Sequence, residues 1–137
     1  MDSKPDQLLS QVKQAPTKVD EQAGLLLTNA EGQMAAVMLS LHSKQPKRGM
    51  ISCEKGYIEV MEYPRAWEAK ITYTDSEKTE LIKAGENADA LAYELADMEK
   101  AINGDPSCMH LDYTKDVMDM MTEFRKSWGF TYPEEEK

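Results

Sequence analysis

This sequence lacks the features that mark several common protein classes. It has only two cysteines, Cys53 and Cys108, which lie far apart and outside any Cys-x-x-Cys pair, so a disulfide framework is not indicated. None of its seven glycines falls in a Gly-x-Gly pattern, so it carries no dinucleotide fingerprint or P-loop. Its longest apolar runs, such as residues 35–39, are far too short to span a bilayer. These absences leave a cytosolic chain with two reduced thiols as the expectation.

The chain is also short of positive charge. It contains 25 acidic and 16 basic side chains, which give a formal net charge of −9. Nucleic-acid binding depends on Lys and Arg neutralising phosphates, and anionic membrane surfaces attract the same side chains. We therefore expect neither a nucleic-acid nor a membrane partner. Residues 1–6 lack the basic and then apolar regions of a secretory signal, which favours a cytoplasmic location.

A length of 137 residues predicts a single domain, residues 1–137. Residues 1–18 are polar and interrupted by Pro5 and Pro16, and their pattern leaves an irregular segment and an edge strand both open. Residues 19–84 are typical of a sheet, residues 87–129 of two helices, and residues 130–137 of a tail. We expect the acidic end of that tail, residues 134–137, to be frayed and solvated.

Alternating side chains and turn residues define the strands of the sheet region. Residues 67–73 alternate between apolar and polar, which indicates a half-buried strand. Residues 29–32 have the composition of a hairpin turn between two apolar strands. Residues 54–56 predict a second turn, with Gly56 where a positive φ would be tolerated. We therefore interpret Lys55 as part of an exposed turn and not as a catalytic base.

Two segments in the last third of the chain share one apolar spacing. The side chains recur at intervals of four, three and four residues, which places each set on one side of a helix. The first set is Leu91, Leu95, Met98 and Ile102, and the second is Val117, Met121, Phe124 and Trp128. Strands followed by helices indicate an α+β fold. We predict an open, mostly antiparallel sheet of about six strands with two C-terminal helices packed on one face.

No group of residues in the sequence predicts a catalytic, cofactor-binding or metal site. The Cys108-Met109-His110 segment resembles a metal fragment, but zinc requires about four ligands and few cysteines or histidines remain. The same segment is a weak candidate for a Cys–His nucleophile in a cofactor-free enzyme, because no neighbour activates the thiol. Met118 and Met121 are expected to be core or interface residues and not metal ligands.

Four large side chains on the central strands are candidate interface residues. A sheet face that presents Tyr57, Met61, Trp67 or Tyr73 would be a large apolar patch, and such patches usually mark an interface. Strand alternation does not determine which face the helices cover. These four residues are therefore candidates for either an interface or the core.

Several ordered segments from residue 19 onward carry a family resemblance. Residues 19–22 open the first clear strand, residues 47–51 lead into the turn at residues 54–58, and Ala92-Tyr93-Glu94-Leu95 begins a helix. Residues 114–128 and 131–133 complete the series. In this order they resemble the C-terminal domain of the glucose–fructose oxidoreductase, inositol dehydrogenase and MocA family, with an ending similar to that of its dihydrodiol dehydrogenase-like members.

This resemblance implies a part of an NAD(P)-dependent dehydrogenase of sugars, inositols or related alcohols. Members of the family carry an N-terminal Rossmann domain and a catalytic lysine in a Glu-Lys-Pro motif, whereas this chain has Glu54-Lys55-Gly56 in a different place. No catalytic residue can therefore be carried over. The expectation is a substrate-side and dimerisation domain that is inactive alone and binds neither NAD nor NADP, which the parent protein would hold in its Rossmann domain. The alternative is an independent binding or assembly module that associates through its open sheet face.

Overall fold

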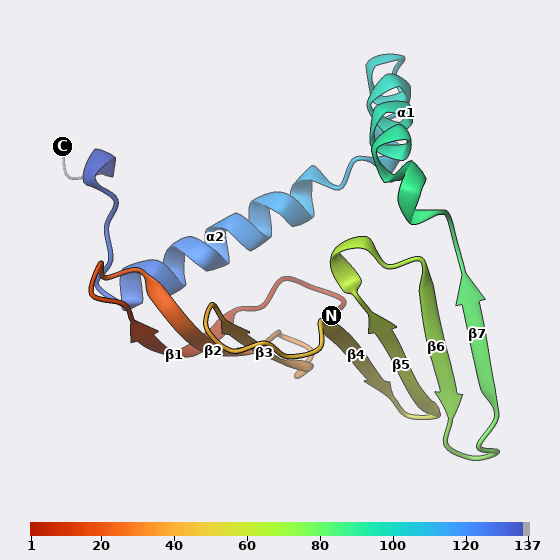
Figure 1. Cartoon of the computed structure of the whole chain (residues 1–137), viewed down its shortest axis with the longest axis horizontal. Coiled ribbons are helices and arrows are strands. Elements are labelled where there is room, and N and C mark those ends of the chain that lie inside the picture. The colour runs from red at the N-terminus through yellow and green to blue at the C-terminus, as the bar shows by residue number, and fades with distance from the viewer. Residues whose placement is uncertain (136–137) are drawn as a thin grey trace. The chain divides into compact units, whose positions relative to one another are not determined.

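The structure, a computed structural model, describes residues 1–135 and consists of two compact units (Figure 1). The first unit comprises Met1–Lys44 and His110–Lys137, and we call it the terminal unit. The second comprises Gln45–Met109, and we call it the central unit. Among the described residues, each unit contains one antiparallel sheet and one α-helix.

The terminal unit is built on a three-stranded sheet. Its strands are β1 (Gln7–Gln14), β2 (Asp20–Thr28) and β3 (Met34–Ser40), with β2 in the middle. The first eighteen residues thus contain an edge strand, the second of the two alternatives open from the sequence. The β2–β3 turn forms as its composition predicts: Asn29 is buried, and its side-chain oxygen accepts a hydrogen bond from the Gln33 backbone N–H at 2.8 Å. Gly32 takes the positive φ of 76° that this turn requires.

The C-terminal end of helix α2 (Leu111–Ser127) lies against β1 on one face of this sheet, as Figure 1 shows. Trp128, directly after the helix, donates an indole hydrogen bond of 2.8 Å to the Ser10 hydroxyl of β1. Phe124 is the buried side chain of the helix. The sequence stripe was only partly right, because Val117 and Met121 are exposed while Met120 is half-buried. The covered side of α2 therefore follows a spacing of four residues from 116 to 128.

The central unit contains a four-stranded antiparallel meander. Its strands are β4 (Arg48–Cys53), β5 (Gly56–Met61), β6 (Glu68–Tyr73) and β7 (Thr79–Lys83), hydrogen-bonded in that order. The turn at Glu54 and Lys55 joins β4 to β5, as predicted. Gly56 is not among the residues with positive φ, so the predicted reason for a glycine there was wrong. A side chain at Gly56 is instead excluded by the Thr72 carbonyl oxygen, which would lie 2.2 Å from an added Cβ.

The central unit also contains short 3₁₀ turns and one α-helix, α1 (Ala90–Ile102). Turn η1 (Tyr63–Arg65) lies between β5 and β6, η2 (Asn87–Asp89) lies between β7 and α1, and η3 (Pro106–Cys108) follows α1. None of the residues of α1 is buried, and the predicted stripe of Leu91, Leu95, Met98 and Ile102 is more than half exposed throughout. The amphipathic helix is therefore present, but the prediction that it packs on a sheet face was wrong for α1. It contacts η2 and η3 instead.

The α+β class and the antiparallel strand pairing are confirmed, and the sheet differs in detail from the prediction. Seven strands are divided between two sheets, where about six strands in one sheet were expected. The division falls between β3 and β4, across the polar segment 41–47 that contains Pro46. A proline lacks the backbone N–H that a ladder needs, which disfavours a continuous hairpin at this point.

Candidate functional site

The terminal unit exposes apolar side chains on the sheet face turned away from α2, which we call the outer face. The strand register aligns Leu9, Leu26 and Ala36 in one row across β1, β2 and β3. Met34 and Met38 lie on the same face at either side of this row, because alternate residues of a strand share a face. Leu9, Met34 and Met38 are 66%, 65% and 68% exposed. A contiguous apolar patch of this kind is typical of an interaction surface.

The outer face arises because the central strand β2 is apolar on both sides. Leu25 and Leu27 point toward the face that α2 covers, as does the buried Ala23, and Leu26 points to the outer face. Sequence reasoning missed this surface, although three consecutive leucines were a usable signal. A strand with one solvated face alternates, whereas a strand that is covered on both faces is continuously apolar.

Glycine allows close packing within the outer face. Met38 faces Gly24 across the β2–β3 ladder, and a Cβ added at Gly24 would lie 3.3 Å from the Met38 sulfur. That separation is tighter than ordinary van der Waals contact. The absence of a side chain at Gly24 therefore leaves room for the flexible Met38 side chain to lie over β2, and Met side chains adapt readily to a partner surface.

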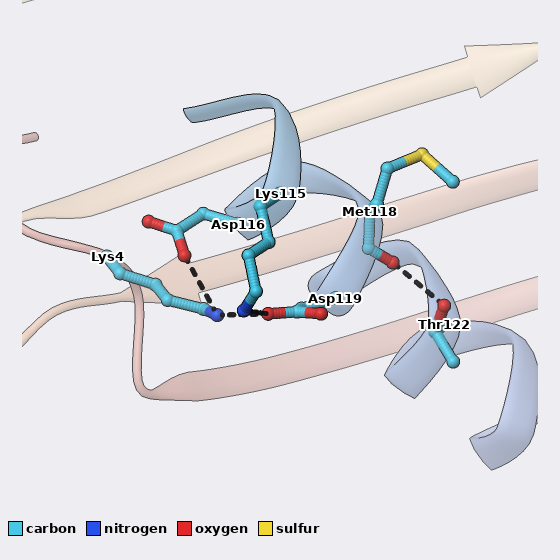
Figure 2. Close-up of polar contacts among 6 residues, drawn as sticks. All are labelled: Lys4, Lys115, Asp116, Met118, Asp119 and Thr122. Atoms are coloured by element: carbon cyan, nitrogen blue, oxygen red, sulfur yellow. Dashed lines mark hydrogen bonds and ion pairs between the residues drawn. The ribbon is translucent and has the colours of Figure 1, made fainter. Parts of the chain in front are cut away.

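A cluster of charges joins the N-terminal segment to α2 (Figure 2). The Lys4 ammonium lies 3.1 Å from the Asp116 carboxylate and 3.0 Å from that of Asp119, and Lys115 also reaches Asp119 at 3.1 Å. These hydrogen bonds raise the pKa of Lys4, and those from Lys4 and Lys115 lower the pKa of Asp119. Solvent screens such exposed pairs, so the cluster positions the segment more than it stabilises the unit.

The C-terminal segment is held on the same helix. Arg125 donates two hydrogen bonds to the Glu135 carboxylate, at 2.6 and 2.7 Å, and its guanidinium lies 4.5 Å from the centre of the Tyr132 ring. The bond from Arg125, followed by one from the Tyr132 backbone N–H, lowers the pKa of Glu135. The prediction of a frayed tail is therefore wrong for Glu135, which lies in the short turn η4 (Pro133–Glu135). Residues 136 and 137 lie outside the described part of the chain.

The four candidate interface residues do not form one patch. The β5–β6 register places Tyr57 opposite Thr72 and Ile58 opposite Ile71, so Tyr57 and Met61 share one face and Tyr73 lies on the other. Trp67 precedes β6, and the Lys83 ammonium lies 4.8 Å from its ring centre. Met61 and Trp67 are exposed, whereas Tyr57 and Tyr73 are half-buried. Their role at an interface stays a prediction.

An open hollow of about 560 Å³ lies in the central unit between η1, the end of β7 and the first turns of α1. Trp67 and Tyr93 supply aromatic surface to it, and Arg65, Glu86 and Glu94 supply charge. The Tyr93 hydroxyl accepts a hydrogen bond from the Glu86 backbone N–H at 3.0 Å, which holds the start of α1 beside the end of β7. The hollow has the size of a small-ligand site, with aromatic and polar groups on its walls.

The remaining candidate residues have ordinary structural contacts. The Cys108 thiol is a weak donor to the Asp97 carbonyl oxygen at 3.5 Å, and the His110 ring stacks on Tyr113 with 5.3 Å between centres. Met118 and Met121 are exposed on α2. Among the described residues, no three His, Cys, Asp or Glu side chains are grouped in a way that could hold a metal ion.

No model of a known protein family and no curated protein matches this chain. Within residues 1–135, neither helix combines the length and the apolar character that a membrane crossing requires.

Proposed function

We propose that this chain is the substrate-side and dimerisation domain of an NAD(P)-dependent oxidoreductase that acts on a sugar, inositol or related alcohol. In this proposal the chain pairs with a second copy through the outer face of the terminal unit. It has no activity alone, because the nicotinamide cofactor and the catalytic lysine belong to a Rossmann domain outside this sequence.

One observation carries the proposal. Helix α2 lies against β1 on one face of the three-stranded sheet, and the sheet exposes Leu9, Leu26, Met34 and Met38 on the other. This is the arrangement that the family resemblance implies for a dimerisation domain, namely an open antiparallel sheet with a helix on one side. Burying such a face against its own copy gives a two-fold, self-complementary interface, the commonest kind in soluble oligomers.

The substrate-side role is assigned to the hollow in the central unit. Aromatic rings such as Trp67 and Tyr93 pack against the apolar faces of a sugar or cyclitol ring, while Glu86, Asn87 and Glu94 offer hydrogen-bond acceptors and donors to its hydroxyl groups. Such a wall orients a polyol without performing chemistry on it. That division agrees with a domain whose partner domain supplies cofactor and catalytic base.

The first test of the proposal is the solution mass of the chain, measured by light scattering over a dilution series. We expect a mass of at least twice the 15.5 kDa of one chain. Leu26→Lys places a charge in the centre of the outer face and should halve that mass, because an unpaired buried charge is costly. The control is Gln7→Lys, which makes the same addition at the periphery of that face and should leave the mass unchanged. A wild-type monomer at every concentration, or a mass unaffected by Leu26→Lys, would contradict the assignment.

A second test concerns the cofactor. Calorimetric titration with NADH and NADPH should give no binding, because this sequence has no glycine-rich phosphate loop. Binding of either nucleotide at millimolar concentration or tighter would refute the proposal that the cofactor half lies elsewhere.

The alternative is a stand-alone assembly module that uses the same outer face without a Rossmann domain. The outer face favours it equally, since association there needs no cofactor half. The two readings differ in the mass of the native protein. Detection of the chain in its source cells as a polypeptide that begins at Met1 supports the module, whereas an upstream in-frame strand–loop–helix rich in glycine supports the oxidoreductase.

A further inference from the structure

Helix α1 and the sheet of its own unit each expose an apolar surface. On α1, the stripe of Leu91, Leu95, Met98 and Ile102 is between 56% and 74% exposed. On the sheet, the register of β4–β7 gathers aliphatic side chains on the face that also carries Tyr73, and we call this the aliphatic face. Its aliphatic residues are Ile51, Ile58, Val60, Ile71 and Ile82, and Glu80 lies opposite Ile71 at the edge strand β7, where it accepts a hydrogen bond from the Tyr73 hydroxyl. Within the described residues of the central unit, no side chain is fully buried.

The two surfaces match in size. A helix of thirteen residues is about 20 Å long, and a strand of six residues spans about the same distance. The stripe on α1 is one residue wide and continuous over the whole helix, because its members recur every three or four residues. It can therefore lie along the aliphatic face from one end to the other.

Local contacts hold α1 away from the aliphatic face of its own chain. The Tyr93 hydroxyl accepts a hydrogen bond from the Glu86 backbone N–H at 3.0 Å. Gly85 takes a φ of 72°, and a Cβ added there would lie 3.3 Å from the Tyr93 ring. At the other end, the Cys108 thiol lies 3.5 Å from the Asp97 carbonyl and packs η3 against the helix. Figure 1 shows α1 standing beyond the end of β7 and not over the face of β4–β7. The helix thus presents its stripe outward.

We propose that two copies of this chain exchange α1, so that the stripe of each copy packs on the aliphatic face of the other. Each chain carries both the stripe and the aliphatic face. Two copies related by two-fold symmetry can therefore cover both surfaces of each other, which leaves neither surface free for a third copy. A buried aliphatic side chain removes on the order of 100 Å² of surface, and a stable interface needs roughly 800 Å² from each partner. The nine side chains of the stripe and the aliphatic face bring each copy close to that area. This contact is separate from the outer face and does not depend on the oxidoreductase proposal.

Cross-linking between two variants tests the exchange directly. Both variants carry Cys53→Ser and Cys108→Ser; one adds Leu95→Cys on α1 and the other adds Ile71→Cys on the aliphatic face. The two differently tagged chains are co-expressed in the Leu26→Lys background, which removes association through the outer face, and then treated with a short bismaleimide. We expect a covalent heterodimer that contains both tags, and at least tenfold less product when either variant is treated alone.

A single chain that carries both Leu95→Cys and Ile71→Cys distinguishes two arrangements. In one, α1 packs on the aliphatic face of the partner copy; in the other, it packs on the aliphatic face of its own chain. A cross-link within one chain at monomer mass, without heterodimer in the mixed sample, would overturn the proposal, as would the absence of any cross-link.

Leu95→Glu provides a second measurement in the same Leu26→Lys background. It should raise the dissociation constant of the exchanged dimer at least tenfold, whereas Ala96→Glu adds the same charge to the opposite side of α1 and should leave it unchanged. Because Leu95 is exposed, this substitution does not compromise folding of the chain, and an equal response of the two variants would also refute the exchange.

Discussion

The terminal and central units have similar strands but differ in what covers them. Both sheets are antiparallel with alternating side chains, yet the terminal unit buries Ala23, Asn29 and Phe124 while the described residues of the central unit include none that is buried. The difference lies in the helices. Trp128, at the end of α2, hydrogen-bonds to Ser10 and brings Phe124 onto the sheet, whereas α1 is held at the end of β7 by Tyr93. An amphipathic helix creates a core only where its termini direct it onto a sheet.

The largest expected effect is the loss of Phe124, a buried aromatic side chain of the terminal unit. Phe124→Ala should lower the free energy of unfolding of this unit by about 3–5 kcal/mol, because it removes a buried ring and leaves a cavity. Hydrogen exchange should show β1–β3 losing protection while β4–β7 is unchanged. The control Met118→Ala, on the exposed side of α2, should change stability by about 0.5 kcal/mol or less. Equal loss of protection in both sheets would mean that the two units unfold together.

The next effect concerns the central unit, where the backbone of β5 approaches that of β6 closely at Gly56 and Thr72. Gly56→Ala should destabilise β5 by about 1–3 kcal/mol, because the new Cβ meets the Thr72 carbonyl oxygen and forces the β5–β6 ladder apart. Gly49→Ala in β4 is a matched control, since nothing lies within 4 Å of an added Cβ there. Hydrogen exchange of β5 and β6 measures the difference. Similar exchange in the two variants would show that the close approach is not required.

A substitution at Asn29 tests whether a buried polar group contributes to the unfolding free energy of the terminal unit, as the buried ring of Phe124 does. Asn29→Ala leaves the Gln33 backbone N–H without its 2.8 Å acceptor and should cost about 1–3 kcal/mol of unfolding free energy. Thermal unfolding followed by circular dichroism measures this cost. Asn87→Ala in the exposed turn η2 is the control and should be nearly neutral. If both substitutions were neutral, water would be replacing the lost partner.

The smallest effect is the pH dependence of the charges on α2. The pKa of Asp119 is lowered in the folded state, so its contribution is complete above its ordinary pKa of 3.8 and is lost as the pH falls through the folded value. The pKa of Lys4 is raised, so its contribution is complete below 10.5 and is lost as the pH rises through the folded value. The Tm of Asp119→Asn should therefore approach that of the wild type only at acidic pH. A constant difference down to pH 2 would exclude Asp119 as the titrating group.

The sequence predicted those elements that depend on neighbouring residues. Apolar runs and the turn at Asn29–Gly32 located β2 and β3, alternation located β6, and periodicity identified both helices. The pattern of residues 1–18 did not decide whether β1 forms. The covered side of α2 was assigned one residue away from its true position, because Met120 and Met121 both continue a helical apolar pattern and only the contact with the sheet distinguishes them. The outer face was not predicted, because it is formed by aliphatic residues of β1–β3 and only strand register shows that they share a face.

Local physical chemistry alone therefore determined where this chain forms strands, turns and helices, because side-chain periodicity and backbone preferences act over a few residues. The tertiary structure decided that β3 and β4 belong to different sheets, that α2 is covered and α1 is exposed, and that Tyr57 and Tyr73 lie on opposite faces. These outcomes depend on strand register and on contacts between residues far apart in the chain, such as Ser10 with Trp128. Periodicity specifies an apolar face, but only long-range packing determines whether that face becomes core or surface.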